Sequence, residues 1–322
     1  MMRFLLPVLA AATLVAQQPD VINGKVEARA LNGPLATEFQ RLEASGASPL
    51  WVAYSFPAVP RQGTMCGTDE HNNIVRLEGP DTLLVLFRLQ DHALDRVQLS
   101  SFDCRFDAGG LPFVYLTGVP PAQSVSLLSG LVRPVTHGDS AIAALALHRD
   151  ASADRALQAM LSQSQPDQVR EKVLFWLANV RGQSGFEAVK KVLLSDPSDE
   201  LREKATFDVT VSKEAGAMPA LVEAARHDRA PRVRKQALFW LARKGGMAQS
   251  AVILQAAEND PDEEVRRQAT FALREIPDGG GIPLLIQLAK TSPDKEVRKQ
   301  AIFWLGRSKD PRATSFFADV LK

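Results

Sequence analysis

The chain has 322 residues, enough for about two domains of the usual size. Charged residues make up 23% and apolar residues 45%, both near globular averages, which excludes a wholly disordered chain. The formal net charge is only +1, so neither a nucleic acid nor an anionic membrane surface is predicted as a partner.

The first sixteen residues, MMRFLLPVLAAATLVA, have the pattern of a secretory signal peptide. Arg3 supplies the positive charge, and an apolar run of twelve residues follows from Phe4 to Val15. A bilayer-spanning helix needs roughly 20 such residues, so no permanent membrane span is predicted. Cleavage is expected after Ala16 or Ala12, which would make the protein periplasmic or secreted. The alternative, a buried N-terminal helix, is interrupted at once by polar residues.

Residues 17–134 predict a β-rich domain. Aromatic and β-branched residues gather there in runs that are bounded by glycine, proline and aspartate. The expected strands are 50–59, 82–89, 95–101 and 111–119, and the two expected helices are 34–45 and 121–132.

Cys66 and Cys104, both in this domain, are the two cysteines of the chain. Export permits a disulfide between them, whereas the alternative is a pair of buried free thiols. We favour the disulfide, since nothing else in the pattern visibly holds this region together. It would close a loop of about 39 residues and contribute roughly 4 kcal/mol in the chain-entropy model.

Internal repeats replace this pattern beyond Pro134. Five Val-Arg or Leu-Arg pairs recur at an interval of 32 residues, and apolar residues follow four and eight positions after the start of each pair. This spacing predicts one face of a helix. The pairs are Val169-Arg170, Leu201-Arg202, Val233-Arg234, Val265-Arg266 and Val297-Arg298.

A second apolar helical segment follows in each unit, and residues 140–161 fit the same frame as a weaker first unit. Each unit is therefore expected to form a helical hairpin. One hairpin cannot bury its apolar faces alone, whereas stacked hairpins share an elongated core. The chain is thus predicted to be mostly α, with an α-solenoid of about six hairpins over residues 137–322.

Short polar residues lie six positions before the repeated arginines. They are Asp196, Asp228 and Asp260, with Ser164 and Ser292 in the first and last places. Such a group can pair with an arginine one unit later in a stack. Because the acidic partners recur, we interpret the arginines as a structural ladder rather than an anion-binding row. The ladder arginines are Arg170, Arg202, Arg234, Arg266 and Arg298.

The recurring Asp, Val-Arg, Ala and Leu positions resemble those of HEAT repeats, and VRKQAIFWLGRSKDPRA from Val297 is especially similar to the short bacterial type. The resemblance covers residues 137–322. It implies the fold and almost nothing about chemistry, since such solenoids have many roles. Residues 17–134 are similar to the leader domain of exported bacterial HEAT proteins of unknown function.

Trp176, Trp240 and Trp304 recur every 64 residues in this frame. The other units carry Ala144, Asp208 and Ala272 at the same position, so bulky and slender residues alternate. We interpret the tryptophans as packing between hairpins, while the alternative is that they line a groove and grip a partner. A carboxylate on a buried face is unfavourable unless it is paired, so any specialised site of the solenoid is expected near Asp208.

A column of charged residues, one per unit, is expected on the solvent face. It turns from acidic to basic along the stack and comprises Glu171, Glu203, Lys235, Arg267 and Lys299. Such a gradient can orient a partner, although an ordinary solvated face has the same composition. A neighbouring column is expected to make contacts between units and comprises Phe175, Phe207, Phe239, Phe271 and Phe303.

Catalytic motifs are missing from the sequence, which has no Walker loop, GxGxxG turn or GxSxG elbow. The deoxyhypusine hydroxylases use His-Glu pairs, which the chain lacks, and export argues against a phycobilin lyase. We therefore predict a non-enzymatic, exported scaffold that binds another protein and needs no cofactor or metal. The alternative is an enzymatic or ligand-binding N-terminal domain with a deep polar pocket between residues 50 and 120. A lyase-type HEAT-like enzyme ranks third.

Overall fold

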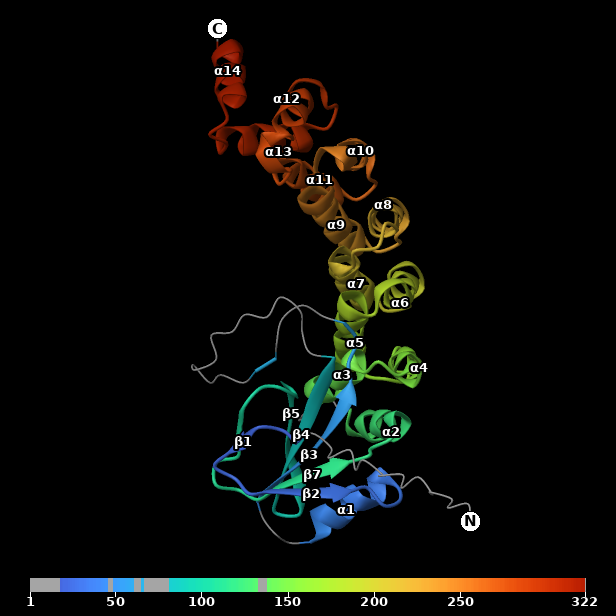
Figure 1. Ribbon diagram of the computed structural model, residues 1–322. Coiled ribbons are helices and arrows are strands. Elements are labelled where there is room, and N and C mark those ends of the chain that lie inside the picture. The colour runs from blue at the N-terminus through green and yellow to red at the C-terminus, as the bar shows by residue number, and fades with distance from the viewer. Residues whose placement is uncertain (1–17, 46–48, 61–64, 67–80, 133–137, 322) are drawn as a thin grey trace, which may run out of the picture. The chain divides into compact units, whose positions relative to one another are not determined.

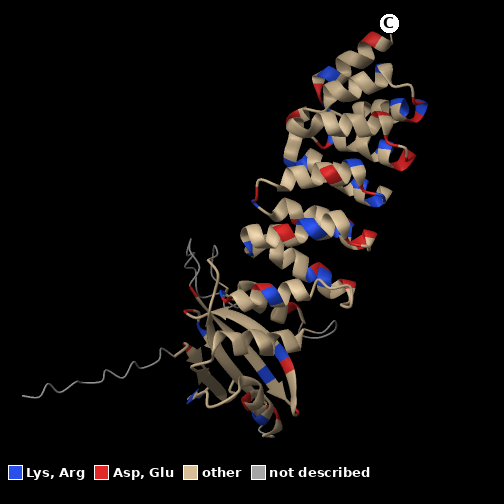
Figure 2. Ribbon diagram, turned by 90° about the vertical axis from the view of Figure 1, so that its right-hand side faces the viewer, with Lys and Arg blue, Asp and Glu red and all other residues tan. Residues whose placement is uncertain are grey.

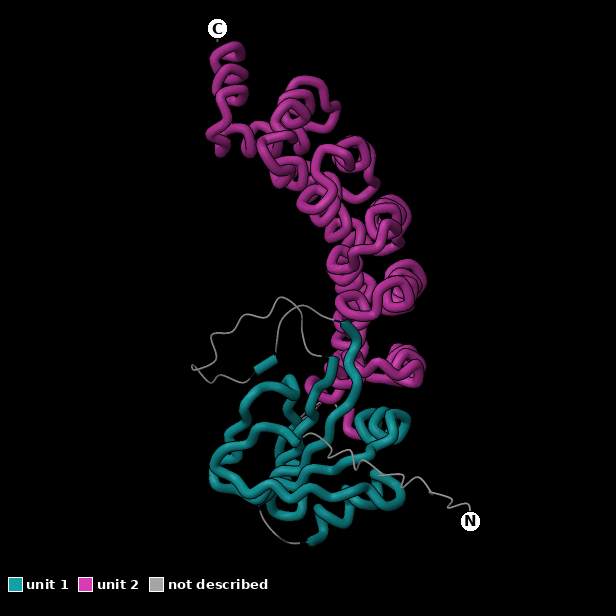
Figure 3. The backbone as a smooth tube through the Cα atoms, in the orientation of Figure 1, with its two compact units in different colours: residues 1–130 teal, residues 131–322 magenta. Residues whose placement is uncertain are grey.

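The computed structural model describes residues 18–45, 49–60, 65–66, 81–132 and 138–321. The predicted signal peptide with its cleavage sites lies outside these residues, as does the predicted domain boundary at 134–137. The chain divides into two compact units, residues 1–130 and 131–322 (Figure 3). The β-strands belong to the first unit, and the described part of the second unit is helical.

The first unit is built around a five-stranded mixed sheet with the strand order β2-β7-β3-β4-β5. These strands are β2 (Val26–Ala30), β3 (Leu50–Pro57), β4 (Thr82–Gln90), β5 (Ala93–Ser101) and β7 (Phe113–Thr117). Strands β2, β7 and β3 run parallel, whereas β3, β4 and β5 run antiparallel. A separate parallel pair joins β1 (Val21–Ile22) to β6 (Phe106–Asp107).

The four strands expected from the sequence are β3, β4, β5 and β7. Strands β3 and β4 are apolar almost without interruption because both faces of the sheet are covered. On one face, Phe39 from α1 (Leu35–Ala44) packs on Phe87 with 5.0 Å between ring centroids, and α2 (Pro121–Leu131) adds buried Leu128. On the other face, Trp51 packs edge-on against Phe106 at 5.0 Å.

The disulfide expected between Cys66 and Cys104 is present. It ties the segment at residue 66 to the turn that follows β5. The backbone N–H of Met65 also donates to Ser101 Oγ at 2.8 Å, beside this cross-link.

The second unit is a stack of helical hairpins, as the repeats predict (Figure 1). The first helices are α3 (Gly138–Leu147), α5 (Asp167–Val180), α7 (Asp199–Val211), α9 (Pro231–Trp240), α11 (Glu263–Arg274) and α13 (Lys295–Gly306). The second helices are α4 (Ala151–Ala159), α6 (Gly182–Ser195), α8 (Ala217–His227), α10 (Ser250–Asn259), α12 (Ile282–Thr291) and α14 (Pro311–Val320). Residues 138–321 therefore hold six hairpins, in agreement with the predicted solenoid.

Neighbouring first helices pack on one another as one layer, and the second helices form the other layer (Figure 1). The repeated apolar positions lie between the layers, where Val173, Leu177 and Leu241 are fully buried. A π-helical turn (Leu241–Gly245) and a 3-10 turn (Gly246–Gln249) connect α9 to α10, and a second 3-10 turn (Pro277–Gly279) precedes α12. None of the described helices is long and apolar enough to cross a bilayer.

Helix α7 shows how tertiary packing overrides local preference. Its segment TFDVTV is rich in β-branched residues, which are weak helix formers. Leu201, Ala205 and Val209 are nevertheless fully buried along one face of the helix. Its start is fixed by Ser198, whose hydroxyl accepts a hydrogen bond from the backbone N–H of Leu201 at 3.2 Å.

Candidate binding surface

The repeated arginines and aspartates form a buried arginine–aspartate ladder between hairpins. Arg202 is 2% exposed, and its Nε and Nη2 donate to the two carboxylate oxygens of Asp228 at 2.8 and 2.9 Å. Its Nη1 donates to the carbonyl oxygen of Asp196 at 2.7 Å. Arg234 repeats this arrangement with Asp260 and with the carbonyl of Asp228. Paired charge-assisted bonds of this kind occupy the guanidinium, so these arginines link hairpins.

Each ladder aspartate pairs with the arginine of the preceding unit, which is opposite to the direction expected from the sequence. Asp196, for example, contacts Arg170. The last rung also shifts, because Arg266 pairs with Asp294 at 2.9 Å and not with Ser292. The serine hydroxyl is shorter and uncharged, and Ser292 Oγ stays buried without a hydrogen-bond partner among the residues that the structure describes.

The ladder changes at the two ends of the solenoid. Arg298 pairs with no aspartate of the described residues, and its Nη1 donates to the carbonyl oxygens of Ser292 and Pro293 at 2.7 and 3.0 Å. At the other end, Arg181 joins the second hairpin to the first through a 2.6 Å ion pair with Asp154. Sequence reasoning missed Arg181, because the first unit departs from the repeat that carries the pattern.

An aromatic row follows the first-helix layer and consists of Phe175, Trp176, Phe207, Phe239, Trp240, Phe271, Phe303 and Trp304. Ring centroids are 5.1 Å apart for Phe207 and Trp240, and 5.0 Å apart for Phe271 and Trp304. Phe239 and Phe271 stack at 6.5 Å, which connects these pairs across hairpins. Three members are well exposed, Phe175 at 38%, Phe207 at 39% and Phe303 at 51%. The phenylalanine column thus makes contacts between units and also faces solvent.

The three repeated tryptophans are half-buried. Their exposure therefore lies between that expected for packing between hairpins and that expected for a groove that grips a partner. The indole Nε1 atoms of Trp240 and Trp304 are buried and find no hydrogen-bond partner in the described part of the chain. The guanidinium of Arg274 lies 5.1 Å from the ring centroid of Trp304, a cation–π arrangement. Each indole therefore contributes one buried edge to the layer, while the rest of the ring borders the exposed phenylalanines.

The charge gradient expected along the first helices is weakened by local pairing. Arg267 pairs with Glu264 and Lys299 with Glu296, each one turn earlier on the same helix. Glu203 accepts from Arg232 Nε at 2.6 Å. Only Glu171 and Lys235 of this column make no ion pair with the described residues. Figure 2 accordingly shows both signs of charge close together along the solenoid.

Asp208 lies where the aromatic row is interrupted. The side chain is 4% exposed and lines a pocket of about 280 Å³ between α3, α5 and α7. Glu171, Phe175, Trp176 and Phe207 line the same pocket. Burial raises the pKa of Asp208 to about 7, with a further contribution from the negative charge of Glu171. The repeat position that holds tryptophan in the two adjacent hairpins thus holds, in the third hairpin, a carboxyl group that is difficult to ionise.

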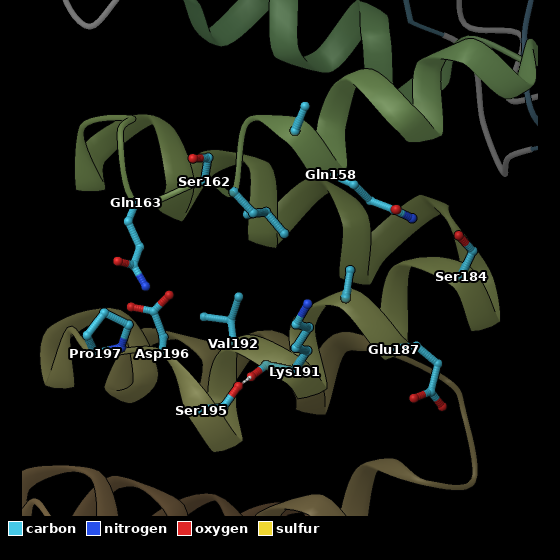
Figure 4. Close-up of a pocket in the computed structure, with 13 residues that line it drawn as sticks. Gln158, Ser162, Gln163, Ser184, Glu187, Lys191, Val192, Ser195, Asp196 and Pro197 are labelled. Atoms are coloured by element: carbon cyan, nitrogen blue, oxygen red, sulfur yellow. Dashed lines mark hydrogen bonds between the residues drawn. The ribbon is translucent and has the colours of Figure 1, made fainter.

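A larger pocket, of about 820 Å³, lies on the second-helix side between α4 and α6 (Figure 4). Gln158 and Ser162 face it from one side, and Lys191 and Ser195 from the other (Figure 4). Several of its polar groups already bond within the protein, since Ser195 Oγ donates to the carbonyl of Lys191 at 2.6 Å and Asp196 belongs to the ladder. Several polar groups of this pocket therefore already have partners within the protein, whereas the carboxyl group of Asp208 has none among the described residues.

Comparison with known families bears on the solenoid. The family described as HEAT repeats matches residues 217–278 and 250–322. Residues 217–322 are HEAT repeats. The ladder and the buried apolar columns extend the same 32-residue arrangement toward the N-terminus, which accounts for the regular stacking of the six hairpins.

Two solved structures are similar to part of this chain. Human deoxyhypusine hydroxylase, in complex with glycerol, has a TM-score of 0.32 and 15% identity, over 59% of this chain and 85% of that one. YibA of Escherichia coli has a TM-score of 0.40 and 21% identity, over 63% of this chain and 78% of that one. No curated protein sequence gives a significant match.

Outside the HEAT repeats, the first unit has a pocket of about 260 Å³ at one end of its sheet. Ser55, Thr82 and Tyr115 line it, and the hydroxyls of Ser55 and Tyr115 are hydrogen-bonded at 3.0 Å. Burial raises the pKa of the Tyr115 phenol. An enzymatic or ligand-binding role of this unit, the alternative considered above, requires a deep polar pocket. The pocket found here is small, and hydroxyl groups form part of its lining. No cluster of three or more potential metal ligands occurs in the described parts of the chain.

Proposed function

We propose that the protein is an exported, non-enzymatic scaffold whose solenoid holds another protein on the first-helix face, which is the exposed surface of the layer formed by α3, α5, α7, α9, α11 and α13. The observation that carries this proposal is the aromatic row. Exposed rings are distributed along it from Phe175 to Phe303, and large aromatic side chains are typical anchors of protein interfaces. The rigid stack beneath them fixes their spacing, because the ladder joins each hairpin from the second to the sixth.

Export is supported by two independent features. One is the apolar run from Phe4 to Val15 behind Arg3, which has the pattern of a signal peptide. The other is the Cys66–Cys104 disulfide, since such bonds persist in oxidising compartments and are rare in the reducing cytosol. These two features support a scaffold that works in a periplasm or outside the cell.

Site-specific photo-crosslinking of the full chain tests where a partner binds. A photoreactive phenylalanine analogue replaces Phe207 or Phe303 on the first-helix face. In matched controls it replaces Leu194 on α6 or Glu223 on α8, which are exposed on the second-helix layer. We expect both first-helix positions to capture the same envelope or secreted protein, and the controls to capture none of it.

Capture of that protein from the second-helix positions alone would overturn the assignment of the binding face. Capture from the first unit alone, with the analogue at exposed Glu27, would move the function to that unit. In either case, an excess of unlabelled purified partner should abolish the cross-link at the position that binds it. Loss of the cross-link at that position then confirms the binding surface.

A further inference from the structure

The pocket between α3, α5 and α7 combines aromatic walls with carboxylates that have no partner. Asp208 is 4% exposed, and its carboxyl group makes no hydrogen bond or ion pair with the described residues. Glu171, which is half-buried, lines the same pocket from α5, and its carboxylate likewise makes neither. Buried carboxylates are normally paired. The carboxyl group of Asp208 therefore lacks the positively charged partner that its burial would require in the ionised state.

Lys172 and Lys204 also line the pocket, but neither forms an ion pair with Asp208. Lys172 pairs with Asp139. Lys204 is exposed, and although its charge lowers the pKa of Asp208, burial and Glu171 outweigh it. A cation that entered the pocket would be attracted by both carboxylates at once.

The last two hairpins show how the solenoid accommodates a cation on the same aromatic row. There the guanidinium of Arg274 lies 5.1 Å from the ring centroid of Trp304, and Ala272 occupies the position that Asp208 holds elsewhere. The residue that corresponds to Arg274 in the hairpin before Trp176 is Ala146, which is buried and uncharged. No side chain of the repeat thus brings a cation to Trp176 in that way.

We propose that this pocket takes one basic side chain, a lysine or an arginine, from the protein held on the first-helix face. The proposal rests on the proposed function. The aromatic rings of Phe175, Trp176 and Phe207 pack against the alkyl chain of this side chain and against its charged group. The carboxylates of Asp208 and Glu171 form ion pairs with the charged group. A volume of about 280 Å³ suits one side chain better than a free cofactor, since ligand pockets usually have ~300–1,000 Å³.

Two synthetic peptides test this proposal with the full chain. They are acetyl-Gly-Ser-Arg-Ser-Gly-amide and the same peptide with neutral citrulline in place of arginine. Fluorine NMR of fluorotryptophan-labelled protein reports on Trp176, while Trp304, already beside Arg274, serves as the internal reference. We expect the arginine peptide to shift the Trp176 signal and to bind roughly tenfold more tightly than the citrulline peptide.

Variants locate the effect. Asp208→Asn should remove the preference for arginine, and Glu171→Gln should reduce it, whereas Glu223→Gln on the second-helix layer should leave it unchanged. Equal affinity for the two peptides, or an unaltered preference in Asp208→Asn, would overturn the proposal. Tighter binding of free arginine amide than of the peptide would also count against it, because a small-molecule site would then be indicated.

The two proposals fail in different ways. If a partner is captured on the first-helix face and Asp208→Asn does not weaken it, the scaffold function stands and the basic-side-chain pocket is wrong. If the arginine peptide binds as expected and no protein is captured on that face, the pocket chemistry stands and the scaffold function is wrong.

Discussion

The β-rich unit and the solenoid are stabilised over different distances along the chain. In the first unit, β2 pairs with β7 and Cys66 is linked to Cys104, so its core requires segments that are far apart in sequence. In the solenoid, each ladder rung joins only neighbouring hairpins. The first unit is therefore expected to unfold as a whole, whereas damage to the solenoid should start at one seam and spread from it.

The largest effect is expected at the ladder. Arg202→Met leaves Asp228, whose side chain is 6% exposed, as a buried carboxylate without its partner. We expect a loss of roughly 3–5 kcal/mol and a less cooperative unfolding transition in urea. Arg298→Met, at the end without an aspartate, should cost less than about 1 kcal/mol. Similar losses for the two variants would contradict the ladder as the link between hairpins.

Removal of the disulfide should affect the other unit. Cys66→Ser with Cys104→Ser should destabilise the β-rich unit by about 2–4 kcal/mol, because the unfolded chain gains freedom. The helical signal of the solenoid in circular dichroism should melt at its former temperature. An equal downward shift of both transitions would show that the two units do not unfold independently.

Asp208 should make the stability of the solenoid depend on pH. Its pKa in the folded state, about 7, lies above the ordinary value of 3.8, so the folded protein binds the extra proton. This stabilisation is complete below about pH 4 and is lost as the pH rises through 7. We expect Asp208→Asn to be more stable than the natural protein by up to roughly 4 kcal/mol at pH 8 and nearly equal to it near pH 4.

Thermal melts at both pH values measure this difference. Glu223→Gln, which alters an exposed carboxylate, should follow the natural protein at each pH. A natural protein whose stability does not fall between pH 5 and pH 8 would show that Asp208 is ionised and compensated in the fold.

The smallest effect is expected at the tryptophans. Trp240→Ala removes a half-buried ring that contacts Phe207 and Phe239, so we expect a loss of about 1–2 kcal/mol, below that of a fully buried tryptophan. Partner binding should weaken beyond this loss, since the same ring supports the exposed row. A loss as large as that of Arg202→Met would favour packing alone.

Much of the fold could be predicted because it depends on sequence patterns that are local and that recur along the chain. The interval of 32 residues places Val173, Ala205 and Ala237 at the same position of three successive helices, on the apolar face of each, and an apolar helix face must be buried. The strands β3 and β4 were evident from their long apolar runs. Strands β1, β2 and β6 were not, because they are short or, like VEARA in β2, alternate charged residues with alanine.

The sequence by itself determined the hairpins, their number and which residues recur, because helix periodicity depends on neighbours within a few turns. Only the tertiary structure decided the direction of the ladder, the choice of Asp294 over Ser292 and the role of Arg181, since these depend on how one hairpin lies on the next. The same holds for Asp208. Its identity suggested an unusual position, but its burial and lack of a partner follow from the packing of α3, α5 and α7 around it.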